Sequence, residues 1–295
     1  MSQRDTLISW MILIAVLLTF WRVNLNSSVL NQLLSDANVG PSRTGPFLIP
    51  SRMRPDEYIS RKYDKQVSDR VEVLRLCRTV KKDLGFMKLY NAMVPEVFCP
   101  NLVRIGEVND GGKWVCHPRA MPDNCAIFSL GVSQDTSFER EMQEITSQKC
   151  SVYSYDKGQP QPSVLEDYSK IRAQFTKALI ANSTNLEKGE RSIGYEMERL
   201  GLKRIEILKI DIEGAEFLVM PTLIKQAKMC QILIEIHGDP KFVVNLVVML
   251  AQAGYRLFSY EINGMYHSLS EYSFIHDDCL ETYGASPLAY YWHLV

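Results

Sequence analysis

The sequence lacks the cysteine and histidine spacings that bind structural zinc. Seven cysteines are present, but no C-x-x-C pair occurs, and cysteines and histidines form no cluster at metal-ligand spacing. We therefore predict no metal site. The cysteine content fits an oxidising compartment better than a reducing one. Cys99, Cys116 and Cys125 are close enough in sequence to include one disulfide, and the odd count leaves at least one thiol free or paired with another chain.

An excess of charge of either sign is also lacking. Lys and Arg number 33 against 34 for Asp and Glu, so the formal net charge is -1. This balance gives no electrostatic footprint for nucleic acid, and we expect no nucleic-acid partner. The 46% hydrophobic content is ordinary for a globular protein, and 295 residues suffice for one large domain. The sequence itself predicts no oligomeric state.

Phosphate-binding signatures are missing as well. No G-x-G-x-x-G segment and no Walker-type lysine occurs, and the glycine-containing loop at residues 131–137 reads only "GVSQDTS". A pyrophosphate cradle therefore has little support, which disfavours NAD and ATP as ligands.

One long apolar run is present at the N-terminus. Residues 6–21 carry no charge, and at 1.5 Å per residue they would span roughly 24 Å as a helix, slightly less than a bilayer of ~27 Å. The residues that follow lack an A-x-A-like cleavage site, so we predict a signal-anchor over residues 1–23. This predicts a single-pass type II membrane protein of the endoplasmic reticulum or Golgi with a lumenal domain. The alternative is a secreted protein.

The rest of the chain divides into three predicted parts. Residues 24–64 are rich in Ser, Pro, Asn and Arg and are predicted to form a stem. Residues 65–97 form a helical lead-in, because apolar residues recur at helical spacing after a candidate cap at Ser68. Residues 98–295 form the main domain. Of two glycosylation sequons, Asn26 lies very near the membrane segment, so Asn182 is the plausible acceptor.

The main domain alternates between strand and helix patterns. A hairpin is predicted over residues 101–117, around an Asp-Gly turn. Further strands are predicted at 125–131, 150–156, 207–212, 230–239, 256–263 and 287–295, with another inside 162–182. Helices are predicted at 136–148, capped by Thr136 or Ser137, and at 194–202 and 242–254. The pattern predicts an α/β fold with a Rossmann-like, doubly wound, mostly parallel sheet, whose last two strands are candidates for an antiparallel edge pair.

In such a sheet, ligands bind beyond the carboxyl ends of the strands. The residues expected there are Gly131, Ser133, Gln134, Asp135, Asp156, Asp211, Glu213, Glu235 and His237. Each alone has a plain structural explanation as a turn former or helix cap, but together they favour a functional site. Asp156 can accept hydrogen bonds from a ribose diol, and Gly131 lets backbone approach a ligand closely. S-adenosylmethionine, which has a ribose and an adenine but no phosphate, suits this set.

The sequence also resembles a known family. The segment "LKIDIEGAEF" is similar to the signature of FkbM-type S-adenosylmethionine-dependent methyltransferases. The ordered set "RIGEVNDGGKWVC", "IFSLGVSQDTSFEREM", "CSVYSYD", "ILKIDIEGAEF" and "QILIEIHG" resembles the methyltransferase-like protein 24 group of anchored type II membrane proteins. The resemblance covers residues 98–295. It departs from typical methyltransferases at Gly131, which stands alone where several glycines are usual, and at Ser129, where an acid is common.

The resemblance implies roles for the site residues. Gly131 would lie at the methionine part of the cofactor, Asp156 at its ribose, and Asp211 and Glu213 at the methyl-transfer centre. The predicted cofactor-binding residues are therefore Gly131, Asp135, Asp156 and Asp211, and the predicted catalytic residues are Asp211, Glu213 and His237.

The chemistry expected at this centre is methyl transfer to an oxygen of a lumenal or secreted small molecule, glycan or protein. His237 or Asp211 could serve as the base for a hydroxyl acceptor, although His237 could equally be a structural histidine bonded to a backbone carbonyl. If the strand persists, Asp211 and Glu213 point to opposite sides, so that one faces the site and the other caps the turn. Two alternatives are a lumenal glycosyltransferase, whose metal-binding Asp-x-Glu the segment mimics, and a catalytically silent binding module.

Overall fold

A computed structural model describes residues 57–108 and 110–295 of the chain. The predicted signal-anchor, the stem up to residue 56 and the Asn26 sequon lie outside the described residues. Within the described ranges, every helix is too short or too polar to cross a bilayer. The membrane anchor therefore stays a prediction.

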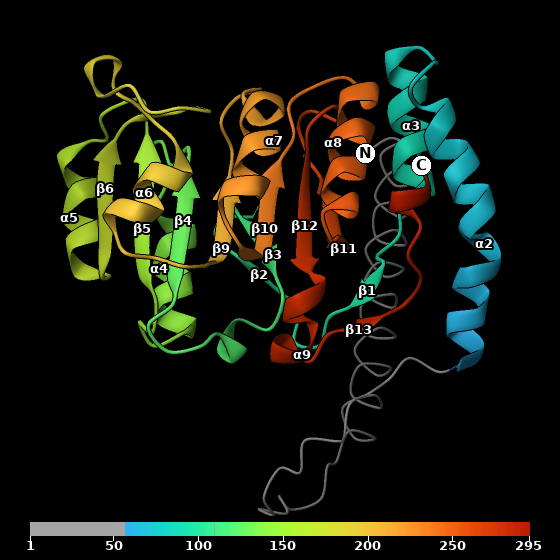
Figure 1. Ribbon diagram of the computed structural model, residues 1–295, viewed down its shortest axis with the longest axis horizontal. Helices are drawn as coiled ribbons and strands as arrows, with labels where there is room; N and C mark the ends of the chain where they lie inside the picture. The colour runs from blue at the N-terminus through green and yellow to red at the C-terminus, as the bar shows by residue number, and fades with distance from the viewer. Residues whose placement is uncertain (1–56, 109) are drawn as a thin grey trace, which may run out of the picture. The chain divides into compact units, whose positions relative to one another are not determined.

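A seven-stranded sheet forms the centre of the fold (Figure 1). Its strand order is β11-β12-β10-β9-β4-β5-β6. Five of these strands, β4, β5, β6, β9 and β10, run parallel to one another. Only β12 opposes its neighbours, pairing antiparallel with both β10 and β11. The strands are β4 Ala126–Leu130, β5 Ser151–Asp156, β6 Ala173–Lys177, β9 Ile205–Ile210, β10 Met229–Glu235, β11 Tyr255–Ile262 and β12 Ser270–His276. This confirms the predicted Rossmann-like, mostly parallel sheet.

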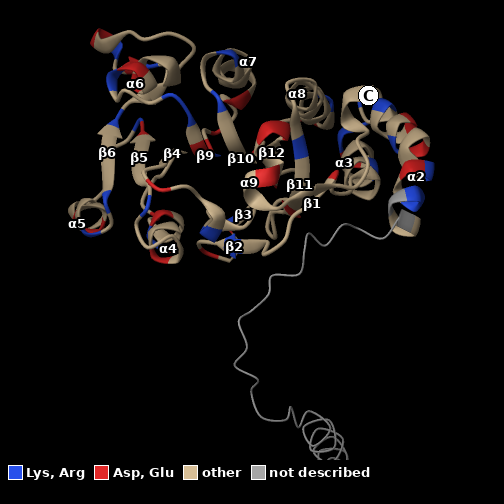
Figure 2. Cartoon of the chain, turned by 60° about the horizontal axis from the view of Figure 1, so that its bottom comes forward, with Lys and Arg blue, Asp and Glu red and all other residues tan. Residues whose placement is uncertain are grey.

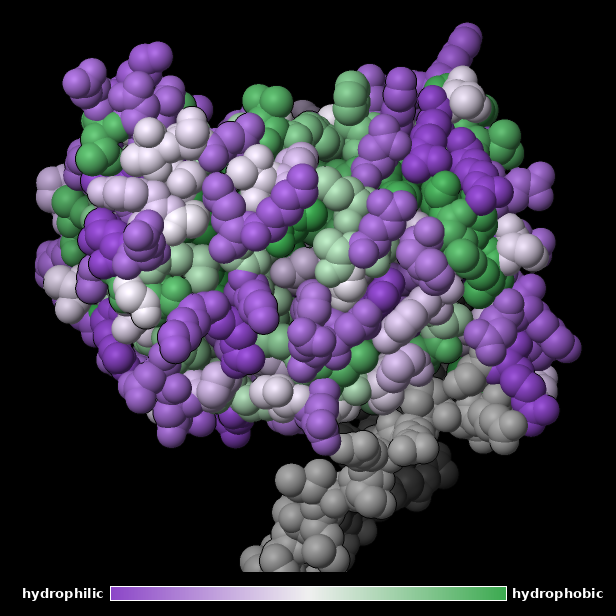
Figure 3. All heavy atoms as spheres, in the orientation of Figure 1, coloured by the Kyte–Doolittle hydropathy of each residue, from purple (hydrophilic) through white to green (hydrophobic). Residues whose placement is uncertain are grey.

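Helices cover both faces of the sheet, so its central strands are buried on both sides. Figure 2 shows α6, α7 and α8 over one face and α4, α5 and the β2–β3 hairpin over the other. The elements are α4 Ser137–Ile145, α5 Pro162–Lys170, α6 Ile193–Arg199, α7 Glu216–Gln226, α8 Pro240–Gln252, β2 Val103–Ile105 and β3 Lys113–Val115. Every residue of β4, β9 and β10 is buried, as expected for near-continuous apolar strands in a parallel sheet. On the outer surface, hydrophilic side chains are spread between apolar ones (Figure 3), as on amphipathic helices.

The helical lead-in consists of two helices rather than one. Helix α2, Glu57–Leu76, begins inside the range predicted as stem and about ten residues before the predicted Ser68 cap; α3, Lys82–Ala92, follows after a turn. Leu74 and Leu89 are fully buried in the core that α8 shares, and the Arg70 guanidinium donates to the Ala92 carbonyl. These contacts make the pair an integral layer at the β11 edge of the domain.

The prediction of a final strand at 287–295 is wrong. Only Ser286–Pro287 (β13) forms a short strand, which pairs with β1, Val97–Phe98, and Trp292–Leu294 is a 3-10 turn. The cause is the buried carboxylate of Glu96, which accepts hydrogen bonds from the backbone N–H groups of Tyr291 and Trp292. The aromatic residues of this segment, including Tyr291 and Trp292, pack in the core without forming an extended strand. Their apolar pattern therefore reflects burial and not strand structure. The strand that does complete the sheet, β12, was not predicted.

Three disulfides join segments of the described chain that are distant in sequence. They are Cys99–Cys116, Cys125–Cys150 and Cys230–Cys279, and Cys77 is a buried free thiol. The first confirms the pairing expected among the clustered cysteines.

The Cys230–Cys279 disulfide should be a main determinant of stability. It joins β10 to the turn after β12 across 49 residues, and closing a loop of that length stabilises the folded state by about 3 to 4 kcal/mol in the chain-entropy account. The double change Cys230→Ser, Cys279→Ser should lower the free energy of unfolding in urea by that order. Cys77→Ser, which breaks no disulfide, is the matched control, and an equal loss in both variants would contradict the prediction.

Candidate active site

The carboxyl ends of the parallel strands carry most of the predicted site residues. Gly131 follows β4, Asp156 ends β5, Asp211 follows β9 and His237 follows β10. Gly131, Asp156, Asp211 and Glu213 line the same groove, whose volume is about 840 Å³. Asp211 and Glu213 also line a smaller cavity with Glu235 and His237. The structure therefore brings the residues together as the topology predicts.

Gly131 is required by the neighbouring strand as well as by any ligand. Its φ is +78°, and a Cβ atom there would lie 1.6 Å from the carbonyl oxygen of Asp211. Its N–H donates to the Tyr155 carbonyl, and the Asp211 N–H donates to the Leu130 carbonyl. The ends of β4, β5 and β9 are thus tied together at this glycine.

An apolar pocket adjoins Asp156. Its lining includes Tyr155, Ala178, Leu179, Ile180, Ile212 and Ala215. The Asp156 carboxylate accepts hydrogen bonds from the N–H groups of Ser133, at 3.0 Å, and Gly158, at 2.6 Å. A carboxylate has about four acceptor sites, so two remain for a ligand diol. A flat heterocycle in the pocket and a ribose at Asp156 fit this arrangement.

Asp135 has a local structural task. Its two carboxylate oxygens accept from the N–H and from the hydroxyl of Ser137, both at 2.8 Å, at the first turn of α4. Thr136 is the N-cap residue, as predicted, but its side chain makes no capping hydrogen bond, and Asp135 supplies that bond instead. Asp135 is exposed and also lines the groove, so its predicted contact with the cofactor stays a prediction.

Ser129 stands in β4 where the family pattern commonly has an acid, and it contacts a carboxylate from α4. It is fully buried in β4 and donates to the buried carboxylate of Glu139 on α4, whose other neighbour is the ammonium of Lys209 at 4.0 Å. The carboxylate beside this strand position therefore comes from α4 and is fully buried.

The turn after β9 places both of its first two acids toward the cavities. Strand β9 ends at Ile210, and Glu213 has a left-handed φ of 55°, so strand alternation does not continue. The turn is instead held by Glu216, which is fully buried and accepts from the N–H groups of Ile212 and Gly214. The expectation that Asp211 or Glu213 caps the turn is wrong, because Glu216 does so.

His237 lies among these acids. Its Nδ1 is 3.3 Å from Glu216 Oε1, and its Nε2 is 3.9 Å from Asp211 Oδ1 and 3.6 Å from Glu213 Oε2. The hydrogen bond to Glu216, reinforced by the charges of Glu216, Glu235 and Asp211, raises the pKa of His237 to about 9. The imidazole is thus bound by a carboxylate and not by a backbone carbonyl. With its pKa raised in this way, the imidazole is positively charged at neutral pH.

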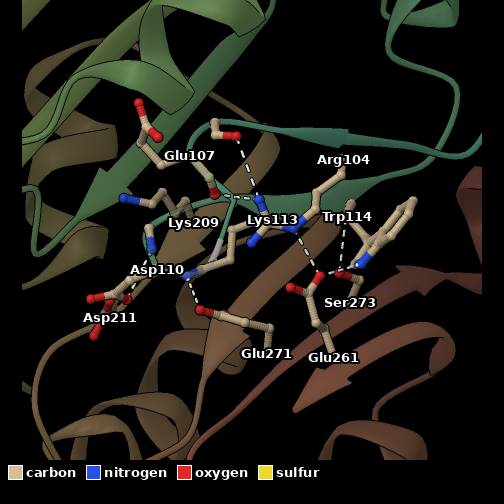
Figure 4. Close-up of polar contacts among 12 residues, drawn as sticks. Arg104, Glu107, Asp110, Lys113, Trp114, Lys209, Asp211, Glu261, Glu271 and Ser273 are labelled. Atoms are coloured by element: carbon tan, nitrogen blue, oxygen red, sulfur yellow. Dashed lines mark hydrogen bonds and ion pairs between the residues drawn. The ribbon is translucent and has the colours of Figure 1, made fainter. Parts of the chain in front are cut away.

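Further charged residues enter the site from the hairpin and from β12. Lys113 and Glu271 form a buried ion pair at 2.5 Å, and Asp110 and Asp211 lie beside it (Figure 4). Burial and the charges of Glu271 and Asp211 raise the pKa of Glu235 to about 8. Of these charged residues, the sequence pattern predicted only Glu235 at the site, because it lies at the end of a predicted strand. Lys113 and Asp110 lie in a hairpin away from the predicted strand ends, and Glu271 lies in β12, which was not predicted.

The sequence matches a family described as "Methyltransferase domain" over residues 78–276, which is more than half of the chain. The chain belongs to this methyltransferase family. The match confirms the predicted enzyme class and its cofactor, S-adenosylmethionine, which the pocket beside Asp156 and the adjoining groove fit. The match is to a general methyltransferase domain and does not identify the FkbM subtype.

Among curated proteins, the chain is similar to the human probable methyltransferase-like protein 24, with 28% identity over 158 residues. The match covers 45% of this chain and 42% of that protein, so the chain spans less than half the length of this relative.

Among solved structures, similarity is weaker. The Methanococcus jannaschii fibrillarin pre-rRNA processing protein is 14% identical with a TM-score of 0.37, covering 60% of this chain and 84% of its own. M. capricolum TrmK in complex with S-adenosylhomocysteine is 15% identical with a TM-score of 0.34, covering 54% and 66%. Likenesses of this size carry no functional conclusion.

Gly131 offers a test of how the strand ends are joined. In Gly131→Ala the new Cβ meets the Asp211 carbonyl, whereas in Gly189→Ala, at a φ of +70°, it meets nothing within 4 Å. Both variants should lose about 1 to 2 kcal/mol from the left-handed backbone, and Gly131→Ala should lose roughly 1 to 3 kcal/mol more from overlap. Urea unfolding measures both, and equal losses would contradict the close contact.

Proposed function

We propose that the chain transfers the methyl group of S-adenosylmethionine to an oxygen of an acceptor held at the carboxyl edge of the sheet. The observation that supports this most directly is the continuity of the cavities. The apolar pocket beside Asp156 and the acidic cavity beside His237 share Asp211 and Glu213 in their walls. A cofactor and an acceptor bound in the two cavities would meet at these residues.

The chain's own groups would hold the cofactor by shape and by hydrogen bonding. Asp156 would accept from the ribose hydroxyls, and the apolar pocket would cover the adenine. Gly131 would leave the backbone open along the groove that Asp135 also lines. When bound, the cofactor supplies an electrophilic methyl group on sulfur.

The acceptor cavity has one acidic wall and one apolar wall. Asp211, Glu213, Glu235 and His237 form the first, and the loop between β11 and β12 contributes the second. That loop lines the cavity with Asn263, Met265, Tyr266 and Leu269. This combination suits a molecule that presents a hydroxyl group on a largely apolar body.

Asp211 is the group best placed to take the hydroxyl proton. Methyl transfer requires chiefly that the acceptor be aligned, and a hydroxyl acceptor needs a base as well. The Asp211 side chain is 18% exposed and lies between the two cavities, whereas Glu213 is 73% exposed. His237 carries its proton near neutral pH and would act as a charged neighbour rather than as the base.

The family match favours methyl transfer over the glycosyltransferase alternative. The catalytically silent alternative makes a different prediction. The proposed enzyme converts S-adenosylmethionine to S-adenosylhomocysteine when an acceptor is present, whereas a silent module does not.

We further propose that the domain faces the lumen of the endoplasmic reticulum or Golgi, anchored in the membrane by residues 6–21, or is secreted. Three disulfides support an oxidising compartment. The sequon residue Asn182 is exposed in a bend between strands, where a glycan can be attached. The acceptor would then be a small molecule, glycan or protein of that compartment.

Asp156 provides the test of cofactor binding. Asp156→Ala should weaken binding of S-adenosylhomocysteine by roughly 10- to 100-fold, or about 1.5 to 3 kcal/mol, because a charge-assisted acceptor is lost. Asp156→Asn should lose less, since its amide oxygen still accepts. Isothermal calorimetry measures each affinity.

The matched control is Asp123→Ala. Asp123 is exposed, pairs with Lys149 and precedes β4 at the opposite end of the strand. Thermal unfolding of each variant shows whether the fold is retained. Unchanged affinity in a folded Asp156→Ala protein would place the ribose elsewhere.

The proposed topology predicts protection from protease. The full chain expressed in animal cells should resist protease in sealed microsomes and become sensitive when detergent opens them. Asn182→Gln should remove any shift in mass produced by glycosidase. Digestion of the domain in intact vesicles would refute the lumenal location.

A further inference from the structure

The acidic cavity contains more negative than positive side chains. Asp110, Asp211, Glu213 and Glu235 line it, and the carboxylates of Glu216 and Glu271 lie directly behind this lining. The cations of the described residues beside them are Lys113, Lys209 and the imidazole of His237. Several of these carboxylates are buried, where uncompensated negative charge is costly.

Three of these residues have the spacing of a metal site. One ligand atom from each of Asp211, Glu213 and His237 lies within 4.8 Å of the others. Ligand atoms about 2.0 to 2.2 Å from one cation are about 3 Å apart when adjacent and at most about 4.4 Å apart when opposite. The side chains therefore need to close by roughly 1 Å, and Glu213, at 73% exposure, is free to do so.

Once cation binding displaces the proton from Nε2, His237 is already oriented as a ligand. Its Nδ1 faces the buried Glu216 carboxylate at 3.3 Å, and its Nε2 faces Asp211 and Glu213. A carboxylate that accepts from one ring nitrogen of a metal-bound histidine fixes the ring and raises its basicity at the other nitrogen.

A further carboxylate oxygen in the cavity is without a partner. Glu235 is 3% exposed, lines the cavity with Asp211, Glu213 and His237, and its Oε1 has no hydrogen bond. Buried polar atoms are nearly always satisfied, so this oxygen indicates a ligand. The neighbouring group of Asp110, Glu235 and Glu271 also has metal spacing, but there the Lys113 ammonium already binds Glu271.

We propose that Asp211, Glu213 and His237 bind a divalent cation, with Glu235 as an additional oxygen ligand. Carboxylate oxygens predominate, which favours an oxygen-preferring ion such as Mn²⁺ or Mg²⁺. Three or four protein ligands leave coordination positions open. An acceptor oxygen bound there would be positioned at Asp211 and made more acidic; this last role depends on the proposed function, whereas cation binding does not.

Mn²⁺ is the probe for the site. The full chain, treated with EDTA and dialysed, is titrated with Mn²⁺ while electron paramagnetic resonance follows the free ion. The unmodified protein should bind about one Mn²⁺ per chain, and His237→Gln and Glu213→Gln should each weaken binding at least 10-fold. His293→Gln and Glu187→Gln, at exposed positions in 3-10 turns, are the matched controls and should bind as the unmodified protein does.

The absence of saturable Mn²⁺ binding in the unmodified protein, or equal binding in the ligand variants and their controls, would refute the site. Calorimetry with S-adenosylhomocysteine on the same metal-free samples separates this result from the proposed function. Mn²⁺ binding without S-adenosylhomocysteine binding would support the cation site and refute the methyltransferase proposal. S-adenosylhomocysteine binding without Mn²⁺ binding would refute the cation site alone.

Discussion

The buried carboxylate of Glu216 is the interaction on which the geometry of the site depends. It accepts from Ile212 and Gly214 and so closes the turn between β9 and α7. The same oxygen holds His237, which follows the next strand of the sheet. One side chain therefore fixes the two acids of the turn and the histidine relative to one another. A carboxylate at the start of a helix is also favoured by the helix dipole, which lowers the cost of burying it.

A second constraint joins this turn to the first half of the sheet. The backbone of Asp211 packs against Gly131 so closely that no side chain fits between them, and the N–H of Asp211 is bonded to the end of β4. The switch in strand order lies between these two strands, since the chain runs outward from β4 to β6 and then returns to β9. The groove opens beside β4 and β9, which are neighbours in the sheet but from which the chain continues in opposite directions. Ligands bind at such a point in open α/β sheets.

The sequence predicted the parts of the structure that depend on local pattern. Apolar runs identified β4, β5, β9 and β10, and their ends identified Gly131, Asp156, Asp211 and His237. What escaped prediction depends on distant contacts. The apolar pattern of residues 287–295 predicts a strand, but their conformation depends on Glu96, some 190 positions away, which binds their backbone. The role of Glu216 was invisible for a similar reason, because burial and not spacing decides which acid of "DIEGAEF" holds the turn. Lys113 and Glu271 could not be linked without the pairing of β12 with β10.

The Asp-x-Glu segment shows why a motif alone cannot decide between enzyme classes. Two acids after a buried strand are compatible with a glycosyltransferase metal site and with a methyltransferase reaction centre, because both need carboxylates at the edge of a sheet. The family match favours the second, and the apolar pocket at the adjacent strand end fits an adenine beside Asp156. The same acids can nonetheless retain affinity for a cation. Charge that is concentrated around His237 must be offset by protons or by a metal ion, and a metal ion bound there would lie within reach of the acceptor as well as of Asp211.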